Sequence, residues 1–264
     1  MVDVMKHEPG AFCWPELATS DAPAARRFYG ELFEWEVVET PLGPDTPATH
    51  AVFQMRGRPV AGLVGMPSAL VDAGVPSHWL SHVAVDDLAG VAARVEPAGG
   101  RIVKTPGPVL DLGHLAVIED PSGAALALWT GLRLAGAGVV NEPGALCWTE
   151  LATPDPAGAT AFYAQVLGWT SRVSGAGGHA YTEFLANGRP VAGQLPMSAE
   201  WGATPAHWMV YFAVVDCDEC VERAIQLGGR VVVPATDVIG TGRFAALADP
   251  QDAVFSVIAL AEAA

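Results

Sequence analysis

The chain has few basic residues and no long apolar run, and these two shortages exclude large classes of protein. Its 264 residues include 14 Lys and Arg against 29 Asp and Glu, which gives a formal net charge of −15. Because nucleic-acid binding requires a basic face that displaces counterions, we expect no nucleic-acid partner. No stretch of about 18–20 consecutive apolar residues occurs, so we expect neither a membrane span nor a membrane partner.

Targeting signals and cysteine chemistry are also scarce. The first residues, MVDVMKHEPG, lack the basic and apolar regions of a signal peptide, which favours a cytoplasmic location. Four cysteines are too few for a disulfide scaffold in a chain of this length. Cys217 and Cys220 form a CxxC pair, but a zinc site needs four ligands and no second pair stands nearby. We interpret both as ordinary residues of a helix start.

What the chain does have is a long internal repeat. Residues 8–21 read EPGAFCWPELATSD and residues 142–155 read EPGALCWTELATPD, with eleven identities in fourteen positions. Downstream, GRPVAG at 57–62 recurs unchanged at 188–193, and PSHW at 76–79 recurs as PAHW at 205–208. A period this long indicates duplicated domains rather than a solenoid of short repeats. We therefore predict a first domain at 1–133, a linker at 134–141 and a second domain at 142–264.

Each copy holds the same series of elements twice. The first series has a strand, a helix opened by Asp21 and three short strands, and the second repeats it with a helix at Asp86–Ala98. The strands predicted in copy one are Phe12–Thr19, Trp35–Glu39, His50–Met55, Val60–Gly65, Trp79–Val85, Arg101–Val103, His114–Glu119 and Ala125–Trp129. The predicted fold is α+β, with four βαβββ modules in two tandem homologous domains.

The modules and their motifs resemble the vicinal oxygen chelate superfamily, which comprises glyoxalase I, bleomycin resistance proteins and extradiol dioxygenases. The resemblance covers nearly the whole chain and is carried by WxELxTxD, PxHW and DPxG. More narrowly, the chain resembles a tandem actinobacterial branch of about its own size, 27.4 kDa, described as glyoxalase-like proteins or hydroxylases. The resemblance implies that the strands of two modules curl into a cup around a small-molecule ligand.

The resemblance also implies metal ligands at two kinds of position, and this sequence departs from both. One kind lies seven residues before the Asp that opens a helix, and the other lies in the last strand of a module. These positions hold Trp14, Leu80, Trp148, Met209, Ala127 and Ser256. Indole and aliphatic side chains do not coordinate divalent ions. We therefore expect no metal ligands and no cofactor; a divalent metal held by other residues stays open.

Two acidic residues and their neighbours are the candidates for chemistry. Residues two apart on a strand share a face, so Glu16 should point into the first cup with Trp14, and Glu150 into the second with Trp148. Each glutamate is either a general base or ligand anchor with a raised pKa, or a structural residue. His82 stands at the equivalent position in the second module, so Glu16 and His82 are the predicted catalytic acid–base pair.

In copy two, Tyr211 replaces His82, and its pairing with Glu150 suits hydrogen bonding better than proton transfer. Aromatic walls suit flat ligands, and core packing is the alternative for every tryptophan. The predicted ligand-binding residues are Trp14, Trp79, Trp148, Glu150, Trp208, Tyr211, His50 and His114. His50 and His114 are included because copy two has Tyr181 and Arg243 in their places.

These observations leave two functions open. The first is a binder of a small aromatic or carbonyl metabolite in a cup without the usual metal ligands. The alternative is an enzyme of the same superfamily, a glyoxalase-like lyase or isomerase or an oxygenase, that uses Glu16 and His82. A third reading, a scaffold for interactions, has no specific support. The sequence does not decide which modules pair to close a cup, or between a monomer and a homodimer.

Overall fold

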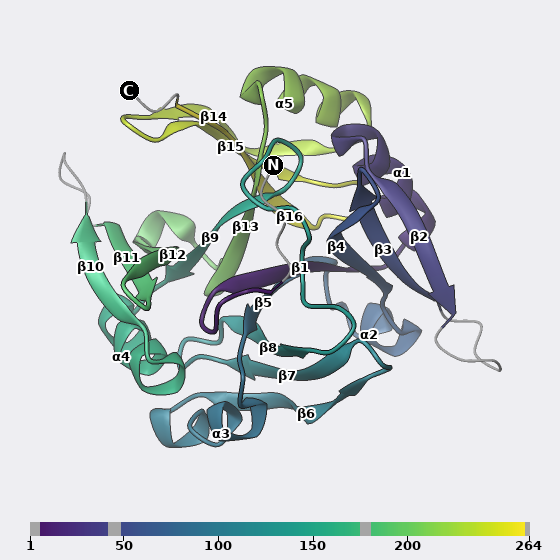
Figure 1. Cartoon of the computed structure of the whole chain (residues 1–264). Coiled ribbons are helices and arrows are strands. Elements are labelled where there is room, and N and C mark those ends of the chain that lie inside the picture. Colours follow the sequence, from purple (N-terminus) through teal and green to yellow (C-terminus); the bar gives the residue numbers. More distant parts are fainter. Residues whose placement is uncertain (1–5, 42–48, 175–180, 262–264) are drawn as a thin grey trace.

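The computed structural model describes residues 6–41, 49–174 and 181–261 (Figure 1). It confirms the α+β class and the two tandem domains, each built on an eight-stranded sheet. The first domain contains β1 (Phe12–Thr19), α1 (Ala22–Phe33), β2 (Glu36–Pro41), β3 (Thr49–Met55), β4 (Arg58–Gly65), α2 (Ser68–Asp72), β5 (His78–Ala84), α3 (Leu88–Ala92), η1 (Glu96–Ala98), β6 (Arg101–Val109), β7 (Gly113–Glu119) and β8 (Ala125–Gly131).

The second domain repeats this order with only small differences in length. It contains β9 (Leu146–Thr153), α4 (Pro156–Leu167), β10 (Thr170–Ser174), β11 (Tyr181–Ala186), β12 (Arg189–Pro196), η2 (Ala199–Trp201), β13 (His207–Ala213), α5 (Cys217–Gln226), β14 (Arg230–Val238), β15 (Gly242–Ala248) and β16 (Val254–Leu260). None of the helices in the described ranges combines the length and the apolar character that a membrane crossing needs.

The strand order shows which modules build each sheet. The first sheet runs β2-β3-β4-β1-β5-β8-β7-β6, and the second runs β10-β11-β12-β9-β13-β16-β15-β14. In each sheet the first strands of the two modules, β1 with β5 and β9 with β13, pair antiparallel at the centre. Each cup is therefore formed by the two modules of one copy, which decides the question of pairing that the repeat pattern left open.

Local sequence explains how the first helix of each domain begins. The side chain of Asp21 accepts a hydrogen bond from the backbone N–H of Ala24, and that of Asp155 does the same for Gly158. These are N-cap bonds, which satisfy backbone donors that have no partner inside the helix. The same contact at equivalent positions holds the strand-to-helix turn of both copies in one geometry.

One predicted helix is shorter than expected. The pattern favoured a single helix at Asp86–Ala98, but the structure has α3 at Leu88–Ala92 and a separate 3-10 turn, η1, at Glu96–Ala98. Pro97 lacks a backbone N–H, so it cannot continue the α-helical hydrogen bonds. Gly90 within the first part further weakens the helix.

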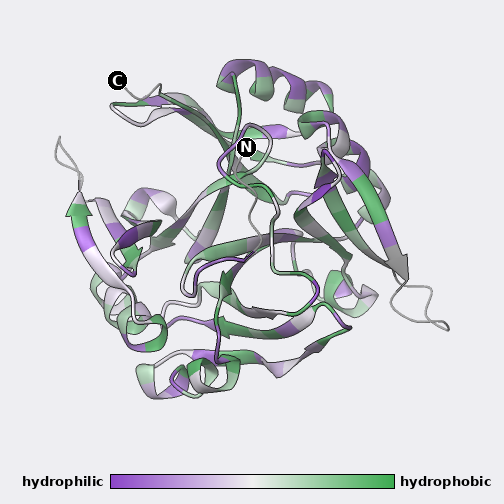
Figure 2. Cartoon of the chain, in the orientation of Figure 1, coloured by the Kyte–Doolittle hydropathy of each residue, from purple (hydrophilic) through white to green (hydrophobic). Residues whose placement is uncertain are grey.

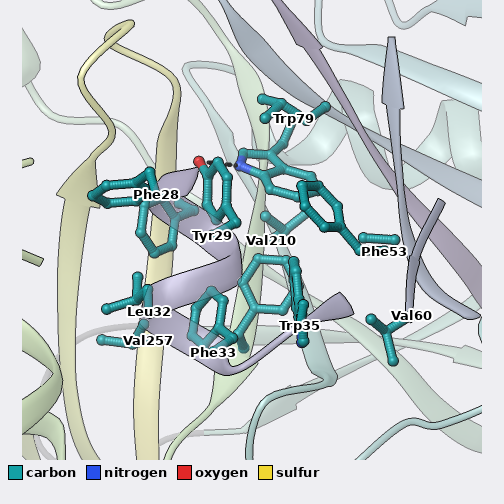
Figure 3. Close-up of a cluster of buried hydrophobic side chains, with 14 of the residues drawn as sticks. Phe28, Tyr29, Leu32, Phe33, Trp35, Phe53, Val60, Trp79, Val210 and Val257 are labelled. Carbon is teal, nitrogen blue, oxygen red and sulfur yellow. Dashed lines mark hydrogen bonds between the residues drawn. The ribbon is translucent and has the colours of Figure 1, made fainter. Parts of the chain in front are cut away.

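Each domain core is shared with the other domain. One cluster joins α1 and its strands to the last module of copy two, and another joins the second module of copy one to α4. At the centre of the first cluster, the indole of Trp79 donates to the hydroxyl of Tyr29 over 3.0 Å, as Figure 3 shows. Tyr29 in turn donates to Asp249 of the other domain over 3.0 Å. The repeat gives the matching set Trp208, Tyr163 and Asp120.

The linker is a packed part of the structure. Ala137 lies in one buried cluster with Trp14 and Trp129, and Val139 lies in the interdomain cluster; both are fully buried. Backbone bonds tie Ala137 to Cys13 of β1 and Gly138 to Pro59 of β4. In Figure 2 much of α5 is hydrophilic, which agrees with the few residues that it buries, whereas hydrophobic residues follow the strands. The linker is thus fixed along the first sheet.

Candidate functional site

Alternation along the strands gives each sheet two faces with different roles. On β5, Trp79 and Val83 pack into the interdomain clusters, while Leu80 and His82 lie on the opposite face. On β8, Trp129 lies on this second face too. We call the second face of the first sheet cup one, defined by Trp14, Glu16, Leu80, His82, Leu115 and Trp129. The equivalent face of the second sheet is cup two, defined by Trp148, Glu150, Met209, Tyr211 and Ser256.

Register across the sheet sets the positions of the polar groups in cup one. Trp14 of β1 lies opposite His82 of β5, and His82 lies opposite Ala127 of β8. Two residues further along β1, Glu16 lies between Gly62 of β4 and Leu80 of β5. A side chain on Gly62 would come within 2.8 Å of the Trp14 indole nitrogen and 2.9 Å of a Glu16 carboxylate oxygen. The indole N–H and the carboxylate are therefore neighbours over this glycine.

Cup one encloses a small cavity of about 30 Å³. Its lining combines the two candidate catalytic side chains with apolar groups: Trp14, Glu16, His82, Val109, Leu112, Leu115, Trp129 and Leu134. A cavity of this size has room for a water molecule or a hydroxyl group rather than for a ring. The predicted pair Glu16 and His82 is thus brought into one cavity, together with Trp14.

His82 is held in one tautomer by the backbone. Its Nδ1 atom lies 3.1 Å from the carbonyl oxygen of Trp14 and 3.2 Å from that of Leu80. Carbonyl oxygens only accept, so Nδ1 carries the proton and donates, and Nε2 keeps its lone pair. Burial lowers the pKa of His82, and the negative charge of Glu16 opposes that shift. The ring is therefore neutral near pH 7.

Glu16 is less buried than its counterpart in copy two. It is partly exposed, whereas Glu150 is 9% exposed. The charge of Glu16 acts on His82, so the two groups are electrostatically coupled across the central strand pair. Coupling of a carboxylate with a neutral imidazole is the arrangement that general acid–base chemistry uses. Cup one therefore has the chemical groups, in one cavity, for moving a proton.

Cup two places the protein's own phenols around its carboxylate. The hydroxyl of Tyr211 donates to Glu150 over 2.9 Å, and the indole of Trp148 donates to the hydroxyl of Tyr181 over 2.8 Å. Burial raises the pKa of Glu150, and hydrogen bonds from Tyr211 and Tyr181 oppose the rise. A side chain at Gly193 would collide with the Tyr181 hydroxyl. The predicted residues Trp148, Glu150 and Tyr211 therefore belong to one hydrogen-bond network, in which Tyr181 joins Trp148 to Glu150.

The remaining predicted site residues lie elsewhere. Trp79 and Trp208 lie on the opposite faces of the sheets from the cups. They are bonded to Tyr29 and Tyr163 in the interdomain clusters, so they do not line a cup. Their expected role in ligand binding is corrected accordingly: strand alternation turns them away. His114 is exposed on β7. His50 belongs to β3, but its side chain lies outside the described residues.

The sequence reasoning missed five residues that line the cavity: Val109, Leu112, Leu115, Trp129 and Leu134. Trp129 lies two residues after Ala127 on β8, so the alternation used for Glu16 would have placed it in cup one. Leu134 reaches the cavity from the linker and Leu112 from the turn between β6 and β7. The indole of Trp129 donates to the Leu134 carbonyl over 2.9 Å. No local pattern predicts contacts that depend on how the linker folds back.

The implied ligand positions and the described donor groups of the cups bear on metal binding. Within the described ranges, no group of three or more His, Cys, Asp or Glu side chains has the arrangement to hold an ion. The positions where the resemblance implied ligands carry the indole of Trp14 and the aliphatic chains of Leu80 and Ala127. Cys217 and Cys220 are free, and burial raises the pKa of their thiols to about 11 and about 12.

Comparisons with known proteins identify the family. Residues 12–128 match the glyoxalase/bleomycin resistance protein/dioxygenase superfamily, and residues 148–258 match a glyoxalase-like domain. The chain belongs to this superfamily, as the motifs indicated. Its fold is similar to the Mn(II)-bound glyoxalase of Novosphingobium aromaticivorans, with a TM-score of 0.62, 16% identity and coverage of 95% of this chain and 82% of that one.

Other relatives show how widely the fold and the sequence are shared. The 2,3-dioxygenase LapB of Pseudomonas sp. KL28 has a TM-score of 0.63 at 15% identity, covering 98% of this chain and 93% of LapB. At such identity the likeness concerns the fold alone. CFP32 of Mycobacterium tuberculosis, which is named as a glyoxylase, is 38% identical over 96% of both chains. The anthracycline biosynthesis protein DauV of Streptomyces sp. is 37% identical, covering 97% of this chain and 95% of DauV.

Proposed function

We propose that the protein binds a small aromatic metabolite in cup one without a bound metal. The observation that carries the proposal is the cavity in which Trp14 and Trp129 meet Glu16 and His82. Mostly apolar walls with a few polar groups are the usual composition of a small-molecule site. Aromatic side chains add favourable offset or edge-to-face contacts with a flat ring.

Cup one supports this function better than cup two. In cup two the carboxylate of Glu150 is bonded to Tyr211, and the indole of Trp148 is bonded to Tyr181. A ligand entering there would have to replace hydrogen bonds that the protein already makes, which is costly for buried polar groups. In cup one, His82 has only its Nδ1 side engaged with the backbone, and its ring lines the cavity.

The size of the cavity sets a condition on binding. A volume of about 30 Å³ does not hold a ring, so the residues that close it must withdraw when a ligand enters. Leu134 and Leu112 are the candidates because they reach the cavity from connecting segments rather than from the central strands. The backbone bonds that join them, from Leu132 and Leu134 to the Leu112 carbonyl, tie these segments to each other. We expect them to move as one unit.

An aromatic ligand also agrees with the relatives. DauV and a second Streptomyces relative, DnrV, are both named as anthracycline biosynthesis proteins. DnrV is 36% identical over 96% of this chain. For this chain we propose the ligand class alone, a small aromatic compound, and not a step in that biosynthesis.

A second candidate function is proton transfer by Glu16 and His82. It is favoured by the electrostatic coupling of the two side chains and by the unprotonated Nε2 atom of His82. An enzyme of this kind would exchange or move a proton next to a carbonyl or a phenol. Deuterium exchange into α-hydroxyketones, followed by proton NMR, would reveal this proton-transfer activity. No exchange above the buffer rate across a series of such ketones would rule against it and leave ligand binding as the proposed function.

The test of the proposal compares the two cups within one protein. Glu16→Gln should weaken the binding of small aromatic compounds, measured by calorimetry, whereas the matched change Glu150→Gln should leave it unchanged. Equal loss from both changes, or loss from Glu150→Gln alone, would contradict the assignment to cup one. Metal content by inductively coupled plasma mass spectrometry, on protein purified without a histidine tag, should be far below stoichiometric. Near-stoichiometric iron, zinc, nickel or manganese would overturn the proposal that cup one binds its ligand without a metal.

A further inference from the structure

We propose that residues 132–135 of the linker form an autoinhibitory strap in which Leu134 takes the place of the ligand in cup one, and that Trp129 donates its indole N–H to an oxygen atom of the ligand once the strap withdraws. This inference rests on the proposed function, because it names how the same site is closed and which ligands open it. These ligands are small aromatic compounds that carry a hydrogen-bond acceptor beside the ring.

Leu134 imitates a ligand in two ways. It lines the cavity together with Trp14, His82 and Trp129, where the ring of a ligand would have to lie. Its carbonyl oxygen accepts the indole N–H of Trp129 over 2.9 Å. A ring that displaces the strap therefore also takes away the acceptor of Trp129. Because a buried N–H without a partner is costly, a ligand that brings its own acceptor is favoured.

The strands, and not the strap, fix the indole ring of Trp129. Gly113 of β7 pairs with Gly131 of β8, and a side chain at Gly113 would come within 2.5 Å of this ring. On its other side the indole meets the ring of His82 edge to face, with the centroids 6.2 Å apart. These contacts come from β5, β7 and β8, so they persist when the strap leaves. The N–H then still points to the place that the Leu134 carbonyl occupied.

Glycines flank the strap at both ends. A side chain at Gly131 would come within 2.5 Å of the Leu134 carbonyl oxygen, and one at Gly136 would collide with the carbonyl oxygen of Cys13. Gly136 also has a φ of +134°, which glycine adopts without strain. Directly after it, the N–H of Ala137 donates to the carbonyl of Cys13 over 2.7 Å, which anchors the rest of the linker to β1. Movement is thus confined to the strap and the turn that it contacts.

The outer contacts of the strap join it to the turn before β7. The N–H groups of Leu132 and Leu134 donate to the carbonyl of Leu112 over 2.8 and 3.1 Å. Arg133 forms an ion pair with Asp111, and the two side chains are 75% and 63% exposed. Exposed ion pairs contribute little to stability, because water and salt screen them. All these contacts survive if strap and turn move together, so the bond from Trp129 to Leu134 is the one that opening breaks.

The repeat offers an internal comparison. Ile258 of β16 stands at the position of Trp129, and Leu260, which is 55% exposed, stands at the position of Gly131. Copy two therefore has an aliphatic side chain at each of these places. The indole donor and the glycine that lets the strap pass occur in the same copy, as expected if they serve one device.

The test uses phenol, which carries an oxygen acceptor, and toluene, which does not, on the unmodified protein and on Trp129→Phe. Phenylalanine keeps an aromatic ring but has no N–H. Calorimetry should show that Trp129→Phe weakens phenol binding about fivefold or more relative to its effect on toluene, because only phenol loses a hydrogen bond. Trp201→Phe, in η2 of the second domain, is the matched control and should change neither affinity.

The outcomes separate this inference from the function on which it rests. Equal effects of Trp129→Phe on phenol and toluene would overturn the donor role of Trp129 and leave an aromatic site intact. Failure of both probes to bind the unmodified protein at millimolar concentration would overturn the proposed function as well.

Nitrogen NMR on the unmodified protein follows the strap itself, and it decides the question even if Trp129→Phe does not fold. In protein labelled with ¹⁵N-tryptophan, toluene should move the indole proton resonance of Trp129 upfield as its N–H loses the Leu134 carbonyl, whereas phenol should keep it hydrogen-bonded. The indole of Trp169, which donates to the carbonyl of Gly10 over 2.9 Å, should stay unshifted as the internal control. A Trp129 resonance that stays unshifted in both complexes would overturn the inference even if the probes bind.

Discussion

Cup one and cup two share a scaffold and differ in the group that faces the glutamate. In cup two, Tyr211 donates to a carboxylate that is almost fully buried, and Tyr181 accepts from Trp148, so these four side chains form one hydrogen-bond network. In cup one, His82 is pinned on one side by the backbone and faces a cavity on the other. Two tyrosines of this network, Tyr211 and Tyr181, correspond to histidines in copy one, His82 and His50.

The linker adds a second difference between the cups. Leu134, in the segment between the domains, lines the cavity of cup one, and Ala137 bonds to Cys13 on the central strand. His7 lies 2.9 Å from the carbonyl oxygen of Ala137, and burial lowers the pKa of this histidine. The duplication thus joins two similar domains in a way that covers one cup with the connection itself.

The largest expected effect comes from removing a hydrogen bond in cup two. Tyr211→Phe removes the phenol that donates to the buried Glu150 and should destabilise the protein by about 1–3 kcal/mol, because an unsatisfied buried acceptor is costly. Chemical unfolding at pH 7 measures this loss. The matched change Tyr181→Phe should cost less, because Tyr181 is only half-buried. If Tyr211→Phe is neutral, the network does not stabilise cup two and the contrast between the cups fails.

The next effect sharpens the contrast by opening cup one. Leu134→Ala removes side-chain volume from the cavity wall, so a ring enters with less rearrangement and phenol should bind about threefold more tightly. Calorimetry with phenol measures the change. Leu132→Ala is the control on the same segment, since Leu132 is 62% exposed and does not line the cavity. Weaker binding in Leu134→Ala would mean that Leu134 contacts the ligand rather than excluding it.

The smallest effect concerns pH. Burial lowers the pKa of His82 below its ordinary value near 6.5, so the ring stays neutral in the folded protein at pH values where a free histidine gains a proton. Phenol affinity should therefore change less than about twofold from pH 8 to pH 6.5 and fall at lower pH, when Nε2 is protonated. An affinity that already falls between pH 8 and pH 7 would contradict a neutral acceptor.

The same shift has a consequence for stability with a defined sign. The folded-state pKa values of His7 and His82 are depressed, so the stability they contribute is complete above the unfolded value and is lost as pH falls through the folded value. The unfolding free energy should therefore decrease on acidification below about pH 6.5. His82→Gln should flatten that decrease, as a series of urea unfolding curves would show.

The sequence predicted the fold well because the fold depends on patterns that are local and repeated. Helix starts at Asp21 and Asp155, strand alternation and the duplicated motifs all appear in the structure at the expected positions. The error at α3 has a local cause, because Pro97 interrupts the helix that hydrophobic spacing favoured. Such interruptions can be predicted from the sequence, because proline has no backbone N–H to continue the helical hydrogen bonds.

The candidate site was predictable only in part. Glu16 and His82 were predicted as an acid–base pair on the condition that their two modules line one cup, and the structure places them in one cavity. Trp79 was placed there too, although it is three residues from His82 and so lies on the opposite face of β5. The closing residues Leu112 and Leu134 come from connections, and their positions depend on long-range packing that no short pattern encodes.

Fluorine NMR of protein labelled with 5-fluorotryptophan would test most directly that cup one, and not cup two, holds the ligand. Trp14→Phe, Trp129→Phe and Trp148→Phe variants would assign the three resonances that matter. On titration with phenol, the resonances of Trp14 and Trp129 should shift while that of Trp148 stays in place. A shift of Trp148 alone, or no shift at any tryptophan, would contradict the account.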